Sequence, residues 1–481
     1  MSIFSTIWGR LKNLFAFETD VSKAFGVQLI ESSIMEGKIR LWNAISSDEP
    51  PWLNAEDGIE TVNMAKHITD TRAKLITLDL GIAVHGSGDK LKVSSTMEQA
   101  PVSGRGEWVQ GIVNNLITRL PEAVSDGLRL GGFILKYNGV NWDFLMPGDF
   151  WITAVDGDGN IVGAVFPEYI TKGSDRFTRL EYHRFEGEHY IVTNKAYRDR
   201  TMGGQQNKLG AVVPLESVEE WAGMRDETII SGVDKPLFGF FRVPGSNTFD
   251  PGSPLGCAVF ANAVNELKAI DIAISRKNDE VEDSRHVTFV GQNVIKSAET
   301  KGITLPRYVK GLGIGLNDSA VSSIHEHNPT LQTDARIKDI NFNLSMAGVK
   351  CGFSEGVFVM DGQTGVITAT QVESDDRDTI QTIKADRDAL QAAVDQALYG
   401  ANVLATLMNL APKGDYEITY SFGDITYSYE EDKASWKYYV SQGWVPAWKY
   451  LMKFEKMTEE EAKALTGEAA AKKKKGLFEV E

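Results

Sequence analysis

The chain has 481 residues, with 66 acidic and 50 basic side chains, so its net charge at neutral pH is −16. This length allows about two to four domains, and a hydrophobic content of 42% supports real cores. Such an acidic chain repels polyanions at long range, so contact with nucleic acid should be local or weak rather than sequence-specific. The presence of only two cysteines excludes a disulfide scaffold and favours a cytosolic fold.

The first 17 residues place apolar side chains at helical spacing, interrupted by Lys and Arg. No small-residue cleavage site follows, so we do not interpret them as a signal peptide. The chain contains no run of about 18 apolar residues, and we expect no membrane span. The pattern predicts an amphipathic helix packed on its own domain or on a neighbour, with a helix on a membrane surface as the alternative.

Residues 1–125 are predicted to be mainly helical. Amphipathic stretches cover 59–80 and 108–120, and Pro121 is expected to close the second. From 128 to 200 the hydrophobic period changes to short β-rich runs separated by Gly, Asp and Asn, which predicts an antiparallel meander with tight hairpins. The predicted strands are 133–137, 151–155, 161–166, 177–182 and 190–193.

A Pro/Gly-rich linker, 236–254, follows the meander. Ser253 and Pro254 make a favourable helix start, so a helix is predicted over 255–283. The next predicted segments are a strand at 287–290, a compact loop-and-strand module at 291–330, and a helix at 331–349.

A loop rich in glycine, 353–365, precedes some 45 residues without proline. A helix of that length would measure roughly 65 Å at ~1.5 Å per residue. Ring assemblies use such long helices to brace one subunit against the next. Beyond it we predict a β segment at 414–429 and a helical region at 435–465, broken near 443–446 and carrying a capping box at 458–461.

Motifs that could carry chemistry are better explained by local structure. The Asp/Gly run 156–160 resembles the start of a calcium loop, but Ile161 and Pro167 stand where the loop needs Gly and Glu. His325 and His327 are too few to bind zinc by themselves. No phosphate loop with Gly-Lys-Ser/Thr is present, so the chain shows no ATP-hydrolysing motor. We therefore assign no catalytic residue, no cofactor and no metal.

Between residues 235 and 271 a phenylalanine-rich segment, a Ser-Pro-Leu-Gly helix start and an Ala-rich helix occur in this order. Their sequences are Lys235-Pro236-Leu237-Phe238, Asp250-Pro251-Gly252-Ser253-Pro254-Leu255-Gly256, Phe260-Ala261-Asn262-Ala263 and Leu267-Lys268-Ala269-Ile270-Asp271. The same order of segments continues downstream with the stretches 348–365 and 368–372, followed by the long helix. This combination resembles the portal proteins of tailed bacteriophages, of the siphophage type infecting Gram-positive bacteria, most strongly over 235–410.

The resemblance implies an α+β portal-type fold with a helical and β wing, a two-helix stem, a small α/β clip, a long kinked helix after a tunnel loop, and a mostly helical crown. The implied boundaries are wing 1–254 with the β meander 128–200, stem helix 255–285, clip 286–330, stem helix 331–352, tunnel loop 353–365, wing 366–427 and crown 428–481.

The function implied by the resemblance is structural. Twelve copies would form a ring at one capsid vertex, through which double-stranded DNA is packaged and ejected. The expected partners are terminase, a head–tail adaptor, and the major capsid and scaffolding proteins, with no small-molecule substrate. The expected location is the virion, and the host cytoplasm during assembly.

Two groups of residues are candidates for DNA contact. The tunnel loop would present Val357, Phe358, Val359, Met360, Asp361 and Gln363 to the DNA. Weak phosphate contacts are assigned to Lys338, Lys472, Lys473, Lys474 and Lys475. The alternative functions are a metal-dependent or carbohydrate-active hydrolase, and a peripheral membrane protein docked by the amino-terminal helix.

Overall fold

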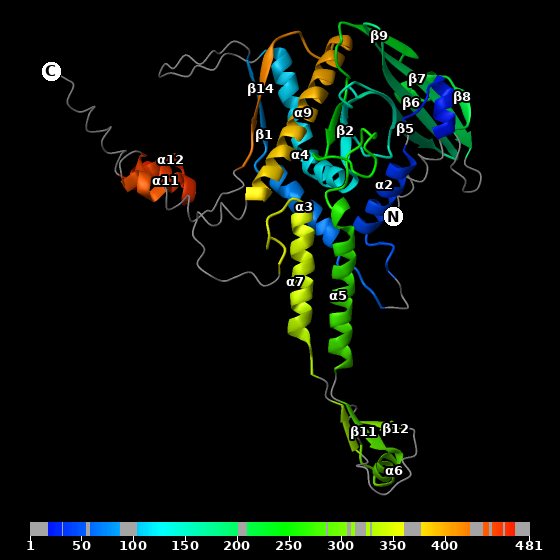
Figure 1. Ribbon diagram of the computed structural model, residues 1–481. Coiled ribbons are helices and arrows are strands. Elements are labelled where there is room, and N and C mark those ends of the chain that lie inside the picture. Colours follow the sequence, from blue (N-terminus) through cyan, green and yellow to red (C-terminus); the bar gives the residue numbers. More distant parts are fainter. Residues whose placement is uncertain are drawn as a thin grey trace, which may run out of the picture. The chain divides into compact units, whose positions relative to one another are not determined.

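The structure is a computed structural model. It describes residues 18–30, 32–53, 58–86, 103–200, 209–284, 287–304, 309–312, 324–327, 330–359, 377–423, 436–441, 445–455 and 457–466. Helices and sheets are mixed, which confirms the α+β class (Figure 1). The chain divides into two compact units, Met1–Thr364 with Gln381–Phe422, and Gly365–Ile380 with Gly423–Glu481.

The amino-terminal part of the first unit is helical, as predicted. It contains a short helix at 18–25, α2 (Ser33–Ser46), α3 (Met64–Ile76) and α4 (Gly104–Leu130).

The expectation that Pro121 ends a helix is wrong, because Pro121 lies inside α4. Leu116, Leu120, Val124 and Leu128 are fully buried at four-residue spacing on either side of it. Burying this continuous stripe outweighs the one backbone hydrogen bond that the proline removes.

Four of the five strands predicted for the meander are confirmed in a six-stranded antiparallel sheet of the order β4-β5-β6-β7-β8, with β9 also beside β7. Its strands are β4 (Trp151–Val155), β5 (Ile161–Lys172), β6 (Asp175–Glu186), β7 (His189–Arg200), β8 (Ala211–Val213) and β9 (Glu227–Ser231). The 3₁₀ turns η1 (Leu215–Ser217) and η2 (Glu219–Trp221) lie between β8 and β9. The β5–β6 and β6–β7 connections are two-residue hairpins that begin with Gly173 and Gly187, whose φ angles of 65° and 59° favour glycine.

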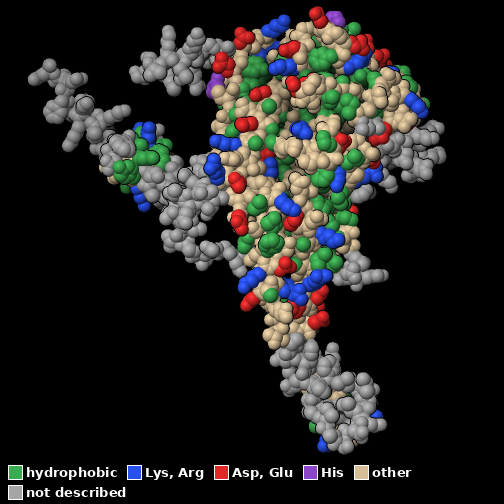
Figure 2. Space-filling model, in the orientation of Figure 1, with side chains coloured by type: hydrophobic (Ala, Val, Ile, Leu, Met, Phe, Trp, Pro, Cys, Tyr) green, Lys and Arg blue, Asp and Glu red, His purple; other side chains and the backbone are tan. Residues whose placement is uncertain are grey.

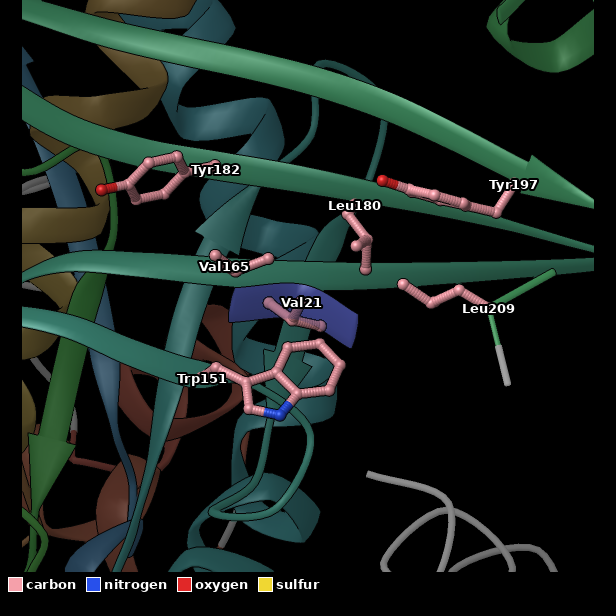
Figure 3. Packing of buried hydrophobic residues seen from close by; sticks show 7 residues of the cluster. All are labelled: Val21, Trp151, Val165, Leu180, Tyr182, Tyr197 and Leu209. Carbon is pink, nitrogen blue, oxygen red and sulfur yellow. The ribbon is translucent and has the colours of Figure 1, made fainter. Parts of the chain in front are cut away.

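One face of this sheet is covered by the helix at 18–25. Val21 is fully buried among side chains of the sheet, including Trp151, Val165 and Leu180 (Figure 3). Phe25 at the end of the helix packs its ring 5.0 Å from that of Tyr182. The short helix is therefore part of the hydrophobic core of the sheet. The preceding predicted amphipathic stretch, residues 1–17, lies outside the described residues.

A second, three-stranded antiparallel sheet has the order β10-β2-β3. It consists of β2 (Gly132–Tyr137), β3 (Trp142–Leu145) and β10 (Gly239–Arg242). The prediction that the strand at 133–137 belongs to the meander is wrong, because β2 pairs in this different sheet with β3 and the distant β10. Strand β3 was not predicted, because its four residues are too few to show an alternating pattern.

Two antiparallel helices, α5 (Val264–Asp283) and α7 (Thr333–Lys350), pack against each other (Figure 1). Ion pairs fix their register. Lys350 Nζ lies 2.6 Å from Glu266 Oε1 at one end, and Arg336 bonds Glu280 at the other. The buried apolar side chains of the pair are Leu267, Ile270, Ala273, Ile340, Leu344 and Ala347.

The predicted start of the first of these helices is wrong, because α5 begins at Val264, after the 3₁₀ turn η3 (Ala261–Ala263). The preceding residues pack against the end of α4 instead. Val259 donates its backbone N–H to Leu128 O at 3.0 Å. A Cβ on Gly256 would lie 2.2 Å from Gly131 O, so this close approach requires glycine.

The chain between α5 and α7 forms a small sheet with one helix. Its elements are β11 (Val287–Gly291), α6 (Gln292–Thr300), β12 (Val309–Leu312) and β13 (Ile324–His327). Central β11 pairs parallel with β12 and antiparallel with β13. The strand β11 was predicted, whereas α6, which joins β11 and β12 as a βαβ unit, was not.

The predicted long helix appears as α9 (Arg377–Leu407), and the first part of the prediction, 366–376, lies outside the described residues. The β segment after it is confirmed as β14 (Tyr416–Ser421), which pairs antiparallel with β1 (Gly81–Gly86).

Described residues of the second unit are largely helical. They include a helical segment at 436–441, α11 (Ala447–Phe454) and α12 (Glu459–Leu465). The predicted capping box at Thr458 and Glu461 is confirmed.

Candidate functional site

The end of α7 is closed by a well-defined cap. Gly352 adopts a φ of +79°, its N–H bonds Val349 O at 3.0 Å, and the N–H of Phe353 bonds Gly348 O at 3.0 Å. These two bonds form a Schellman motif, in which a left-handed residue ends the helix. A Cβ on Gly352 would also lie 2.8 Å from Thr382 Oγ1 of α9. Glycine is therefore required both for the turn and for the close approach of α9.

A single buried guanidinium joins three helices at this junction. Arg72 of α3 makes a bidentate pair with Asp386 of α9, with Nε–Oδ2 at 2.6 Å and Nη2–Oδ1 at 2.8 Å. Its Nη1 donates to the Cys351 carbonyl at the end of α7, at 2.8 Å. Burial raises the pKa of Asp386, while the hydrogen bonds and charge of Arg72 act to lower it. The clamp thus ties the end of α7, just before the predicted tunnel loop, to α3 and α9.

Further contacts hold α9 along its length. Arg387 donates to the carbonyls of Leu75 and Ile76, the last residues of α3. Near the other end of α9, Arg105 donates to Asn402 O at 3.0 Å and to Pro412 O at 3.0 Å. A cation at the carboxyl end of a helix satisfies its free carbonyls and complements its dipole. These contacts make α9 a fixed element of the first unit.

The structure places only part of the predicted tunnel loop. The Phe358 ring packs 4.9 Å from Phe353 and 5.7 Å from His67, and a Cβ on Gly348 would lie 3.1 Å from it. Val357 is 43% exposed and Val359 is half-buried. Met360, Asp361 and Gln363 lie outside the described residues. Their role in lining a DNA path therefore stays a prediction.

The predicted phosphate contact Lys338 is exposed on α7, whereas Lys472, Lys473, Lys474 and Lys475 lie outside the described residues. Acidic and basic side chains both lie on the surface of the two-helix part (Figure 2). The exposed charged residues there include Arg276, Asp279, Glu282, Asp283 and Asp334. A surface of mixed sign can touch phosphates locally without binding a polyanion tightly.

Sequence reasoning missed a buried ionic network between the sheets. Glu181 of β6 accepts from Lys136 Nζ at 2.8 Å and from Arg179 Nη1 at 3.0 Å. Although burial acts in the opposite direction, these two cations hold the pKa of Glu181 well below its usual range. A charged residue inside a predicted strand, such as Lys136, is the sequence signal that could have revealed the network.

His183 extends this network toward the linker that precedes β10. Tyr190 accepts the Leu237 N–H at 3.2 Å, so its hydroxyl hydrogen is free to donate to His183 Nδ1 at 2.8 Å. The imidazole then donates from Nε2 to Glu181 Oε1 at 2.5 Å. Burial lowers the pKa of His183, which favours the neutral ring. The hydrogen bonds to Tyr190 and Glu181 then select the Nε2–H tautomer.

Comparison with known proteins found neither a matching protein family nor a matching curated protein. Within the described residues no helix is long and apolar enough to cross a bilayer. In the same residues no group of three or more His, Cys, Asp or Glu side chains is placed to hold a metal ion.

Proposed function

We propose that this chain is the subunit of a portal, a ring of about twelve copies that surrounds a channel for double-stranded DNA at one vertex of a viral capsid. The proposal includes packaging and ejection of DNA through the ring in the virion, and assembly in the host cytoplasm. Terminase, a head–tail adaptor and the capsid and scaffolding proteins would dock on it. It rests on the sequence resemblance and on the arrangement of α5, α7 and α9.

The observation that carries the proposal is the path of the chain through these helices. After β10 the chain runs along α5 and forms the small sheet of β11, β12 and β13. It then runs back along α7, antiparallel to α5, and continues past the Gly352 cap to α9. In this reading α5 and α7 are the stem, and the small sheet is the clip on which partners dock. The segment between α7 and α9, with Asp361, would face the DNA.

The charge of the chain suits a channel through which DNA must slide. A subunit of net charge −16 repels phosphates, so DNA would not adhere to the wall during translocation. Salt screens this repulsion over about 8–10 Å, and single lysines such as Lys338 can then make brief contacts. Energy for packaging would come from a separate ATP-hydrolysing terminase, because the chain contains no phosphate loop.

Replacing Phe342 with glutamate is expected to separate the ring into subunits. Phe342 is 64% exposed on α7, away from the buried Ile340 and Leu344, and we assign it to the contact with a neighbouring stem. A carboxylate buried there without a partner would cost several kcal/mol per contact. Light scattering after gel filtration should show wild-type rings and mostly single subunits of the variant, with unchanged circular dichroism.

The matched control is Val140→Glu, which places the same carboxylate at a 76% exposed apolar site in the β2–β3 turn. Its rings should be as stable as those of the wild type. If Phe342→Glu formed rings as readily as Val140→Glu, Phe342 would not lie in the contact between subunits. Sugar hydrolysis or flotation with liposomes by the purified wild type would instead support the two alternative functions.

A further inference from the structure

A cavity of about 620 Å³ lies between the two sheets, outside the helices assigned to the channel. The β2–β3 hairpin forms one wall, β5 and β6 form the other, and Arg119 of α4 closes one side. Its volume is in the range of small-molecule sites. The proposed channel function makes no use of this cavity.

Most of its charges are paired, either within the β5–β6 wall or, for Lys136 and Glu181, across the cavity. Arg179 makes two hydrogen bonds to Glu168 Oε2, at 2.6 and 2.9 Å, as its direct cross-strand partner on β5. Lys136 and Arg179 also share Glu181, as described above. The pairing leaves both of these basic side chains neutralised by carboxylates of the six-stranded sheet.

Two carboxylates of the lining, Asp143 and Asp149, lie outside this pairing, and Asp143 is the one in the β2–β3 hairpin. It stands directly opposite Lys136 in the β2–β3 ladder, where a cross-strand ion pair would be expected. The Lys136 ammonium instead reaches Glu181 of the other sheet. Among the described residues the hydrogen bonds to Asp143 come from Asn138 Nδ2, at 3.1 and 3.2 Å. A carboxylate has about four acceptor sites, so Asp143 can accept further donors from the cavity.

Part of the cavity lining is aromatic, from Phe166 of β5 and Phe144 of β3. Asp143 stands opposite Lys136 in the ladder, and so shares the face of the hairpin on which the Lys136 ammonium reaches Phe166. Arg119 already lies with its guanidinium 5.0 Å from the centre of the Phe144 ring, and the Lys136 ammonium lies 5.2 Å from that of Phe166. Aromatic faces of this kind favour a positively charged neighbour and accept the alkyl part of its chain.

We propose that this cavity binds an alkylammonium or alkylguanidinium group, which donates hydrogen bonds to the Asp143 carboxylate while its alkyl part rests on the aromatic part of the lining. The chemistry is that of a lysine or arginine side chain. It can be supplied by a free organic cation or by a basic side chain of a second copy of this chain. The bound cation would donate to Asp143 in place of Lys136, whose ammonium pairs with Glu181.

The test uses n-butylguanidinium as the probe and n-butylurea, its neutral analogue of nearly the same shape, as the control ligand. Saturation-transfer NMR and calorimetry on the full chain should detect binding of n-butylguanidinium and no binding of n-butylurea. Asp143→Asn should weaken binding of the cation by tenfold or more. Asp158→Asn, at the exposed tip of the β4–β5 turn, should leave it unchanged.

Asp143→Glu keeps the negative charge, so its affinity for n-butylguanidinium should stay within a few-fold of that of the wild type. This result would show that weak binding by Asp143→Asn comes from the lost charge and not from misfolding.

Binding of n-butylguanidinium by both assembled and dissociated protein would identify a free cation as the occupant. Binding by dissociated protein alone would identify a side chain of a neighbouring copy. Equal binding of n-butylurea, equal binding by Asp143→Asn, or no binding to either form would overturn the proposal.

Discussion

Replacing Arg72 with methionine is expected to lower the free energy of unfolding of the first unit by about 3–5 kcal/mol. Arg72 and Asp386 are 7% and 0% exposed, so the variant leaves a fully buried carboxylate without its cation. The Cys351 carbonyl loses its donor as well. Urea denaturation followed by near-ultraviolet circular dichroism measures this loss, which is a large share of a typical domain's stability.

Two further variants separate the buried pair from a general effect of losing a cation. Lys66→Met removes the exposed bridge to Asp70 on the same helix, and its effect should stay within about 0.5 kcal/mol. The double variant Arg72→Met, Asp386→Leu should recover much of the stability, because two apolar side chains need no partner. If Arg72→Met were as mild as Lys66→Met, the clamp between α3, α7 and α9 would not hold the junction.

Glu181→Gln is expected to cost a similar amount, about 3–5 kcal/mol, because Lys136 would remain buried without its carboxylate and Arg179 would keep only Glu168. The matched control is Glu220→Gln, which removes the exposed bridge to Lys172 and should be nearly neutral. The same denaturation experiment measures both variants.

The pH dependence gives this prediction a second readout. The folded-state pKa of Glu181 is depressed, so its stabilisation is present above the ordinary value of 4.5 and is lost as pH falls through the folded pKa. The pKa of His183 is also lowered, and its contribution begins to fall below pH 6.5. The gap in stability between wild type and Glu181→Gln should therefore narrow in acid. A gap that stays constant down to pH 3 would contradict the assignment of Glu181 as the ionised centre.

Patterns within single elements were readable from the sequence. Alternation of apolar residues located β4 to β7, and the long proline-free run located α9. The errors came from tertiary contacts that local patterns do not contain. The α4 helix continues through Pro121 because apolar side chains on both sides of the proline are buried. The α5 helix begins later than predicted because the residues before it bond to the end of α4, as Val259 does to Leu128.

The candidate site was less accessible to sequence reasoning. Gly352 was not singled out, although a glycine just past a predicted helix is a signal for a helix cap. Its second role, the close approach of Thr382 from a helix 30 residues further on, appears only in the fold. The Arg72–Asp386 clamp joins residues more than 300 positions apart, and only the fold brings them together. The network around Glu181 depends on cross-strand register, which alternation alone does not give. Whether the loop beyond Val359 faces DNA stays a prediction.

Electron microscopy of the purified protein, with class averaging, tests the ring most directly. The proposal predicts closed rings with a central hole wide enough for duplex DNA, and a mass in solution of about twelve times 53.0 kDa. The Phe342→Glu protein, examined in the same way, should give few rings. A wild-type protein that stays a 53.0 kDa monomer at micromolar concentration, with no ring in any class, would contradict the proposed function.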